Sequence, residues 1–186
     1  MAKTPSNMLE LGTLAPLFSL PNVINQQKFS LTTNPSYHAT LIMFICNHCP
    51  YVKRVNPELV RLANDYQDKK VRFIAINSND IENYPDDSPD NMKKTALAEQ
   101  YPFPYLYDAT QEVAHAYRAA CTPDFYLFDA NLILVYRGQL DDARPGNQIE
   151  VNGIHLRKAI DQVLSNTPVT VEQKPSLGCN IKWKQP

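Results

Sequence analysis

The sequence predicts an α/β fold with a central mixed β-sheet flanked by helices, because two different arrangements of elements follow one another along it. In the first, a strand, a helix and a strand occur at 39–45, 52–66 and 71–77. Such a βαβ unit places its two strands parallel in one sheet. In the second, two apolar strands joined by a tight turn precede a helix, which indicates a ββα half that begins with an antiparallel hairpin.

Apolar spacing predicts each element of the first half. The runs ATLIMFI (39–45) and VRFIAIN (71–77) are short and apolar, as expected of buried strands. Upstream, PLFSLPNVINQQKFSL predicts an added N-terminal β-hairpin. Between the two strands, apolar residues recur every three or four positions, which is the pattern of an amphipathic helix: Val52, Val55, Leu59, Leu62, Ala63 and Tyr66.

Two helices and a short strand are predicted before the second half. One helix begins with Ser88 as N-cap and Pro89 at its first position, where proline is favoured. FPYLYD (103–108) is a short strand, and TQEVAHAYRA (110–119) is a short helix capped by Thr110.

The second half is predicted from residue 124 onward. DFYLFD (124–129) and LILVYRG (132–138) form the hairpin, and a last helix opened by Asn152 follows. Residues 166–186 have no periodicity and are expected to form an extended tail packed on a domain of residues 1–165. The last helix carries an apolar stripe: Leu156, Ala159, Ile160, Val163 and Leu164.

Composition narrows the functional classes. The 186 residues carry a net charge of −1 and no basic run, so nucleic acid is not an expected partner. The longest apolar runs, LIMFIC and LILVY, are far shorter than the ~20 residues of a membrane helix, and the N-terminus lacks the apolar segment of a signal peptide. We therefore expect a soluble cytoplasmic protein, whose four cysteines are catalytic, metal-binding or buried rather than paired in structural disulfides.

The stretch LIMFICNHCPYV (41–52) places two cysteines where a strand gives way to a helix. If Pro50 takes the first helical position, Cys49 is the N-cap and Cys46 lies in the connecting loop. The positive end of a helix stabilises a thiolate and lowers cysteine pKa values from ~8.5 to as little as ~3.5–7.5. Cys49 is therefore the predicted nucleophile.

The chain resembles the thioredoxin-fold superfamily, on its AhpC/TSA branch of peroxiredoxin-like and redoxin proteins. LAPLFSLPNV…QQKFSL, MFICNHCPYV, NPEL and CTPDFYLFD carry the resemblance over residues 12 to 165. The match is nearest to a peroxiredoxin-like group with CNHCPYVK, CTPD and a late GCNIKW. The resemblance implies a thioredoxin-like fold. It also implies that the active cysteine, placed by Phe44 and Pro57, is Cys49.

The same resemblance implies roles for residues around Cys49. Thr122–Pro123 matches the cis-proline loop that faces the active cysteine and leaves the backbone of Thr122 free to pair with an extended substrate. Cys121 then lies next to the site, and His48 stands where thioredoxins often carry tryptophan. Cys46 replaces the threonine that orients peroxide in peroxiredoxins, and position 43, often a buried acid in thioredoxins, is a methionine.

These features favour a thiol–disulfide oxidoreductase in which Cys49 attacks and Cys46 resolves the mixed intermediate. The expected partners are a disulfide-bearing protein or a small thiol or peroxide substrate, together with a cellular dithiol reductant. No cofactor motif is present, and no metal is required. Two alternatives stay open: a thiol peroxidase whose Cys49 sulfenic acid is captured by Cys46, and a copper or zinc binding module using the four cysteines, or His48 in place of one.

The segment PSLGCNIKW near the C-terminus predicts a tail that folds back. Gly178 permits a sharp reversal, while Ile181 and Trp183 offer apolar area that pins the segment to a surface. The tail is expected to approach the Thr122–Pro123 loop and to bring Cys179 within disulfide reach of Cys121 or of the active pair. The alternative is that Cys179 is a small buried residue beneath a docked tail.

Overall fold

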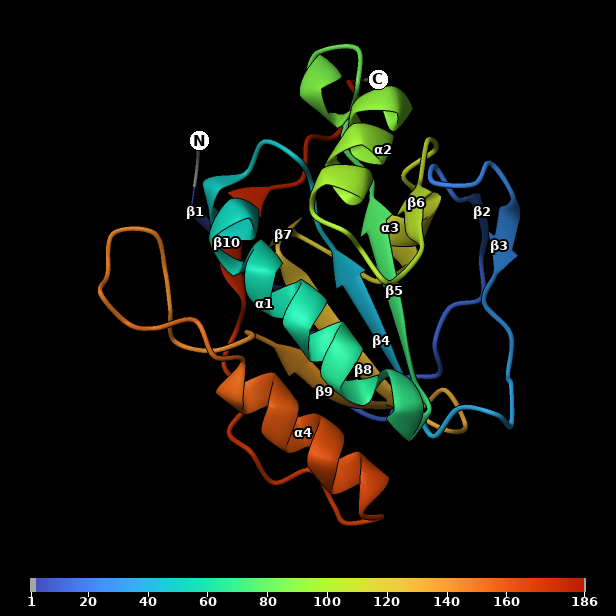
Figure 1. Cartoon of the computed structure of the whole chain (residues 1–186), viewed down its shortest axis with the longest axis vertical. Coiled ribbons are helices and arrows are strands. Elements are labelled where there is room, and N and C mark those ends of the chain that lie inside the picture. Colours follow the sequence, from blue (N-terminus) through green and yellow to red (C-terminus); the bar gives the residue numbers. More distant parts are fainter. Residues whose placement is uncertain (1–2, 186) are drawn as a thin grey trace.

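The computed structural model describes residues 3–185 and shows the predicted mixed α/β architecture (Figure 1). Five strands form the central sheet in the order β6-β5-β4-β8-β9. β4 (Ala39–Phe44) lies at its centre, parallel to β5 (Val71–Asn77) and antiparallel to β8 (Asp124–Asp129). β6 (Tyr105–Tyr107) extends the parallel side, and β9 (Leu134–Gly138) forms the hairpin with β8. The βαβ and ββα halves are confirmed.

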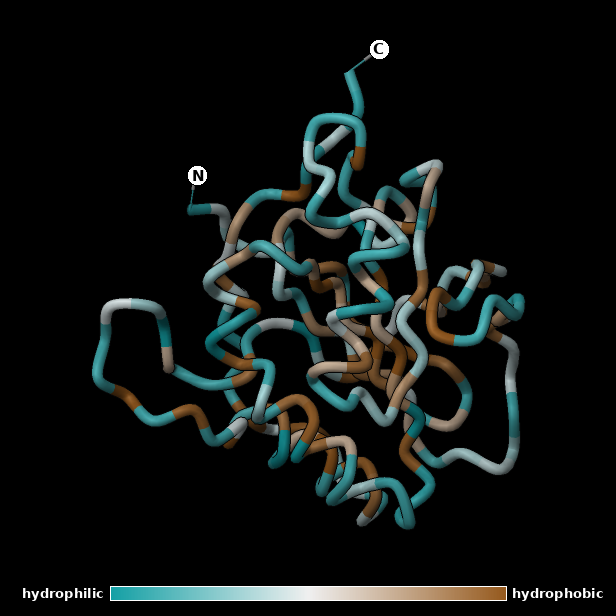
Figure 2. The backbone as a smooth tube through the Cα atoms, turned by 45° about the horizontal axis from the view of Figure 1, so that its top comes forward, coloured by the Kyte–Doolittle hydropathy of each residue, from teal (hydrophilic) through white to brown (hydrophobic). Residues whose placement is uncertain are grey.

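Helices cover both faces of the sheet. They are α1 (Pro50–Tyr66), α2 (Pro89–Ala98), α3 (Glu112–Ala116) and α4 (Ile154–Leu164), with short 3₁₀ helices η1 (Gln67–Lys69) and η2 (Pro85–Asp87). Because side chains alternate along a strand, Leu41 and Met43 of β4 pack with α1, α2 and α4, whereas Ile42 and Phe44 pack on the other face with α3. The hydrophobic segments gather inside the molecule in Figure 2.

The N-terminal hairpin is also confirmed, as strands β2 (Ser19–Pro21) and β3 (Lys28–Ser30). None of the helices within residues 3–185 is long and apolar enough to cross a membrane.

A second, three-stranded sheet was not predicted from the sequence. β10 (Leu177–Asn180), in the C-terminal tail, pairs on one edge with β1 (Lys3–Pro5) and on the other with β7 (Cys121–Thr122). The tail is therefore extended, as expected, but its extended form is fixed by hydrogen bonding to two distant segments. In Figure 1 this strand lies beside the first turn of α1.

Helix starts differ from the sequence prediction at two places. α3 has Gln111 rather than Thr110 at its N-cap position, with φ of 64°, while the Thr110 hydroxyl accepts the Glu112 N–H at 3.4 Å. α4 has Gly153 at this position, also with φ of 64°, rather than Asn152. Thr110 and Asn152 lie one position before the N-cap, and the side-chain oxygen of each accepts a hydrogen bond from the N–H of the first helical residue. Ser88 does occupy the N-cap position of α2, although its hydroxyl makes no capping bond.

Candidate active site

Cys49 occupies the N-cap position of α1, with Pro50 at the first helical position, as the sequence predicts. β4 ends at Phe44, and the short loop that follows carries Cys46 and brings it next to the helix start. Both thiols are covered: Cys49 has no exposed surface and Cys46 is 2% exposed. The end of β4 and the proline at position 50 thus place two cysteines at the N-terminus of α1. The helix dipole is positive at this end.

The Thr122–Pro123 loop faces these thiols, and the peptide bond between the two residues is cis. The Cys49 Sγ lies 3.2 Å from the carbonyl oxygen of Thr122, and the Cys46 Sγ lies 3.2 Å from its hydroxyl. Thr122 is therefore in contact with both cysteines. The loop therefore faces Cys49, in the position that the resemblance implies.

The two thiols of the CNHC segment differ in acidity. The pKa of Cys49 falls to about 5, chiefly because Cys46 donates a hydrogen bond to its thiolate; Cys179 and the backbone of Val52 add smaller stabilisation, while burial opposes the shift. The pKa of Cys46 rises well above its usual value because of the same interaction with Cys49 and because of burial. At neutral pH the site therefore holds one thiolate, on Cys49, beside a protonated Cys46.

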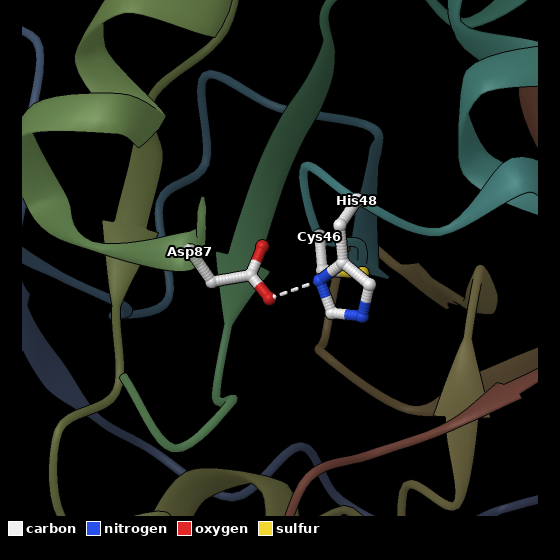
Figure 3. A group of neighbouring side chains, drawn as sticks. All are labelled: Cys46, His48 and Asp87. Atoms are coloured by element: carbon white, nitrogen blue, oxygen red, sulfur yellow. Dashed lines mark hydrogen bonds and ion pairs between the residues drawn. The ribbon is translucent and has the colours of Figure 1, made fainter. Parts of the chain in front are cut away.

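His48 lies between the two cysteines in sequence and is paired with a carboxylate that the sequence analysis missed. Its Nδ1 lies 2.6 Å from Oδ2 of Asp87, which is fully buried in η2 (Figure 3). The Asn47 N–H and the Asn79 side chain also donate to this carboxylate. The hydrogen bond to Asp87 raises the pKa of His48. The His48 ring is partly covered by Tyr84, which stacks on it at 5.7 Å between ring centroids.

The other two cysteines have different surroundings. Cys179, on β10, places its Sγ 2.8 Å from the Sγ of Cys49. Cys121 is fully buried, and its thiol faces the carbonyl of Pro123 at 3.7 Å. Burial raises the pKa of Cys121, which makes no hydrogen bond to another sulfur within the described chain. All four thiols are free, and three of them belong to one buried cluster.

The structure does not gather the four cysteines into a metal site. Within residues 3–185, a single group of three potential ligand side chains has its ligand atoms within 4.8 Å of one another: Cys46, His48 and Asp87 (Figure 3). In this group Asp87 already accepts hydrogen bonds from three donors, including His48. A metal ion here would have to replace these bonds and would leave out Cys49 and Cys179.

A second buried carboxylate lies near the small sheet. Asp124 begins β8 opposite Phe44 and accepts hydrogen bonds from Ser6 and Tyr126. Burial raises its pKa to about 7. Its hydrogen bonds go to these residues rather than to either thiol of the CNHC segment, so no catalytic role is assigned to it.

Two solved structures are similar to this chain over nearly its whole length. A structure of an uncharacterized conserved protein from Geobacillus kaustophilus is 61% identical, covering 100% of this chain and 98% of that one, with a TM-score of 0.97. A hypothetical protein from Sinorhizobium meliloti 1021 is 45% identical, covering 98% and 100% of the two chains, with a TM-score of 0.95.

A more distant structure shows the fold class. The thioredoxin domain of a thiol-disulfide oxidoreductase from Bacteroides vulgatus is 18% identical, covering 72% of this chain and 91% of that one, with a TM-score of 0.61. The curated protein sequences yield no match to this chain. The AhpC/TSA family model matches residues 11–137. The chain therefore has a thioredoxin-like fold and belongs to the AhpC/TSA family.

Proposed function

We propose that the protein is a thiol–disulfide oxidoreductase in which Cys49 attacks the substrate disulfide and Cys46 resolves the mixed disulfide. The observation that carries this proposal is the placement of two neighbouring thiols at the N-terminus of α1, both in contact with Thr122 of the cis-proline loop, with Cys49 the more acidic of the two. A cellular dithiol then returns the oxidised protein to its reduced state.

The attack requires a thiolate, and the helix end supplies it. Only Cys49 occupies the N-cap, where the backbone N–H of Val52 and the thiol of Cys46 both stabilise its negative charge. His48, held by Asp87, adds a positive charge nearby when protonated. Attack by the Cys49 thiolate forms a mixed disulfide with one substrate sulfur and releases the other as a thiolate.

The second step requires Cys46 to lose its proton. Once Cys49 is bonded to the substrate, it no longer carries the charge that raises the pKa of Cys46. The Thr122 hydroxyl, 3.2 Å away, can then donate a hydrogen bond to the Cys46 thiolate. Attack on the Cys49 sulfur releases the second substrate thiolate and leaves a Cys46–Cys49 disulfide.

Membership of the AhpC/TSA family supports a second candidate function, thiol peroxidase activity. Here the Cys49 thiolate attacks a peroxide oxygen, becomes a sulfenic acid and is captured by Cys46 with loss of water. The side chain three residues before Cys49 is a thiol rather than a hydroxyl, but the Thr122 hydroxyl contacts that thiol. The two functions share Cys49 and differ in the oxidant.

One experiment separates the two functions. The reduced protein is mixed with hydroxyethyl disulfide, with insulin or with hydrogen peroxide, and thiol oxidation is followed by mass spectrometry after acid quenching. The proposal expects rapid oxidation by the disulfides and slow oxidation by peroxide. Because Cys49 is fully covered, the small disulfide is expected to react faster than insulin. Faster oxidation by peroxide would favour the peroxidase.

The variants assign the attacking residue. Cys46→Ser is expected to form a mixed disulfide through Cys49, and Cys49→Ser is expected to form none. Formation of a mixed disulfide through Cys46 in Cys49→Ser, at the wild-type rate, would contradict the proposal.

A further inference from the structure

We propose that Cys179 is a second resolving thiol for Cys49, presented to it by strand β10. The inference rests on the proposed thiol–disulfide activity and adds a residue from the opposite end of the chain to its site. It gives Cys49 two internal partners, one from its own loop and one from the C-terminal tail.

The position of Cys179 is fixed by pairing on both edges of β10. On one edge Cys179 is opposite Thr122 of β7, and on the other it is opposite Lys3 of β1. Gly178 allows the approach, because a Cβ on it would lie 2.0 Å from the carbonyl oxygen of Thr122. This glycine has no positive φ, so it serves close backbone contact rather than the sharp reversal expected from the sequence.

Both ends of β10 are also anchored. The Ser176 hydroxyl, just before the strand, donates to the carbonyl of Gly138 at 2.6 Å. After the strand, Ile181 is 1% exposed and packs in the core on the α3 side of the central sheet. The N–H of Lys182 donates to the side chain of Asn79 at 2.8 Å. A Cys179 side chain on a freely moving tail would meet Cys49 only occasionally, whereas this strand holds it there.

The backbone of Thr122 is therefore already paired, in contrast to the expectation that it is free for an extended substrate. β10 takes the place expected for a substrate strand beside the cis-proline loop, and it carries a cysteine opposite Thr122. The thiol of Cys179 is thus presented to Cys49 as the sulfur of a bound substrate would be. A small buried residue needs only to fill space, whereas this one has its Sγ 2.8 Å from the reactive sulfur.

The chemistry balances without a further oxidant. After Cys49 has formed a mixed disulfide Cys49–S–S–R, the Cys179 sulfur attacks the Cys49 sulfur, and the S–S bond between Cys49 and the substrate sulfur breaks. RS⁻ leaves and takes the proton of Cys179 as RSH, and the Cys49–Cys179 disulfide forms. The substrate disulfide has then gained two electrons and the protein has lost two. An external dithiol reduces the new disulfide and becomes a disulfide itself.

The test follows release of the second substrate thiol. Reduced protein receives one equivalent of hydroxyethyl disulfide and is quenched with acid, alkylated and digested without reductant for mass spectrometry. We expect a Cys49–Cys179 linked peptide in the wild type and, in greater amount, in Cys46→Ser. Cys46→Ser should still release the second thiol, whereas Cys46→Ser/Cys179→Ser should stop at the mixed disulfide. The loss in the double variant should be about 100-fold or more, because no internal thiol remains beside Cys49.

Matched variants keep the outcomes distinct. Cys121→Ser removes a buried thiol that makes no hydrogen bond to another sulfur within residues 3–185, and this variant should release both substrate thiols at the wild-type rate. Cys179→Ala replaces Cys179→Ser if the serine variant has a lower thermal midpoint. If Cys46→Ser accumulates the mixed disulfide as fully as the double variant, Cys179 does not resolve it, while the proposed function stands. If Cys49→Ser still reacts like the wild type, the proposed function fails instead.

Discussion

Substituting Gly178 by alanine perturbs the contact that brings β10 against the cis-proline loop. An added Cβ would lie 2.0 Å from the carbonyl oxygen and 2.6 Å from the carbonyl carbon of Thr122, whereas real Cβ contacts are essentially never under 3.0 Å. Both partners are backbone atoms, so no flexible side chain can turn aside. Strand β10 must therefore move away from β7 by about 1 Å or more.

This displacement sets the expected loss of stability and the expected loss of reaction rate in Gly178→Ala. Forcing a methyl group into packed structure costs about 1–3 kcal/mol, which for a domain of this size lowers the thermal midpoint by roughly 2–4 °C per kcal/mol. A displacement of about 1 Å can slow a reaction between positioned groups by about 100-fold. In a Cys46→Ser background, Gly178→Ala should therefore slow formation of the Cys49–Cys179 disulfide by about that factor.

Two assays and one control test these numbers. Thermal unfolding measures the midpoint, and quenched peptide mapping measures the rate of disulfide formation. Gly12→Ala is the control: Gly12 has φ of 85° and no atom within 4 Å of an added Cβ, so it should lower stability through backbone strain and leave the disulfide rate unchanged. An unchanged midpoint together with an unchanged disulfide rate in Gly178→Ala would refute the proposed close contact.

Two further predictions concern the buried carboxylates. Asp87→Asn removes the charged acceptor 2.6 Å from His48 Nδ1, so the raised pKa of His48 should fall, as measured by NMR titration of its ring proton; an unchanged pKa would show that Asp87 does not control this ring. For Asp124, burial raises the folded-state pKa to about 7, against about 3.9 when unfolded. The folded state therefore binds the extra proton between these values, and the stability of the wild type relative to Asp124→Asn should fall as pH rises from about 4 to about 7. Urea unfolding across this range measures the difference, and a difference independent of pH would contradict the prediction.

Residues close in sequence were sufficient to predict that Cys49 caps the N-terminus of α1. Proline at position 50 directly after a cysteine, preceded by an apolar strand, predicts the N-cap from neighbouring residues alone. The continuous apolar run of β4 and the three- and four-residue apolar spacing in α1 likewise depend on residues close in sequence. These features were predicted because the interactions that create them are short-range.

The missed features depend on distant partners. β10 has four residues, including a glycine, and its extended form comes from pairing with β1 and β7. Asp87 is the last residue of η2 and has other acids close to it in sequence, Asp86 and Asp90, so nothing in its local sequence distinguishes it as the partner of His48. Asp87 becomes the partner of His48 only because η2 packs against residues 46–49 in the folded chain.

The titration of the Cys49 thiol decides whether this residue is a thiolate at neutral pH. Thiolates absorb in the ultraviolet, and the difference in absorbance between the reduced wild type and Cys49→Ser reports this one residue without requiring any reagent to reach the buried sulfur. We expect a midpoint near pH 5. A midpoint near the ~8.5 of an ordinary cysteine would contradict the assignment of Cys49 as the attacking thiolate.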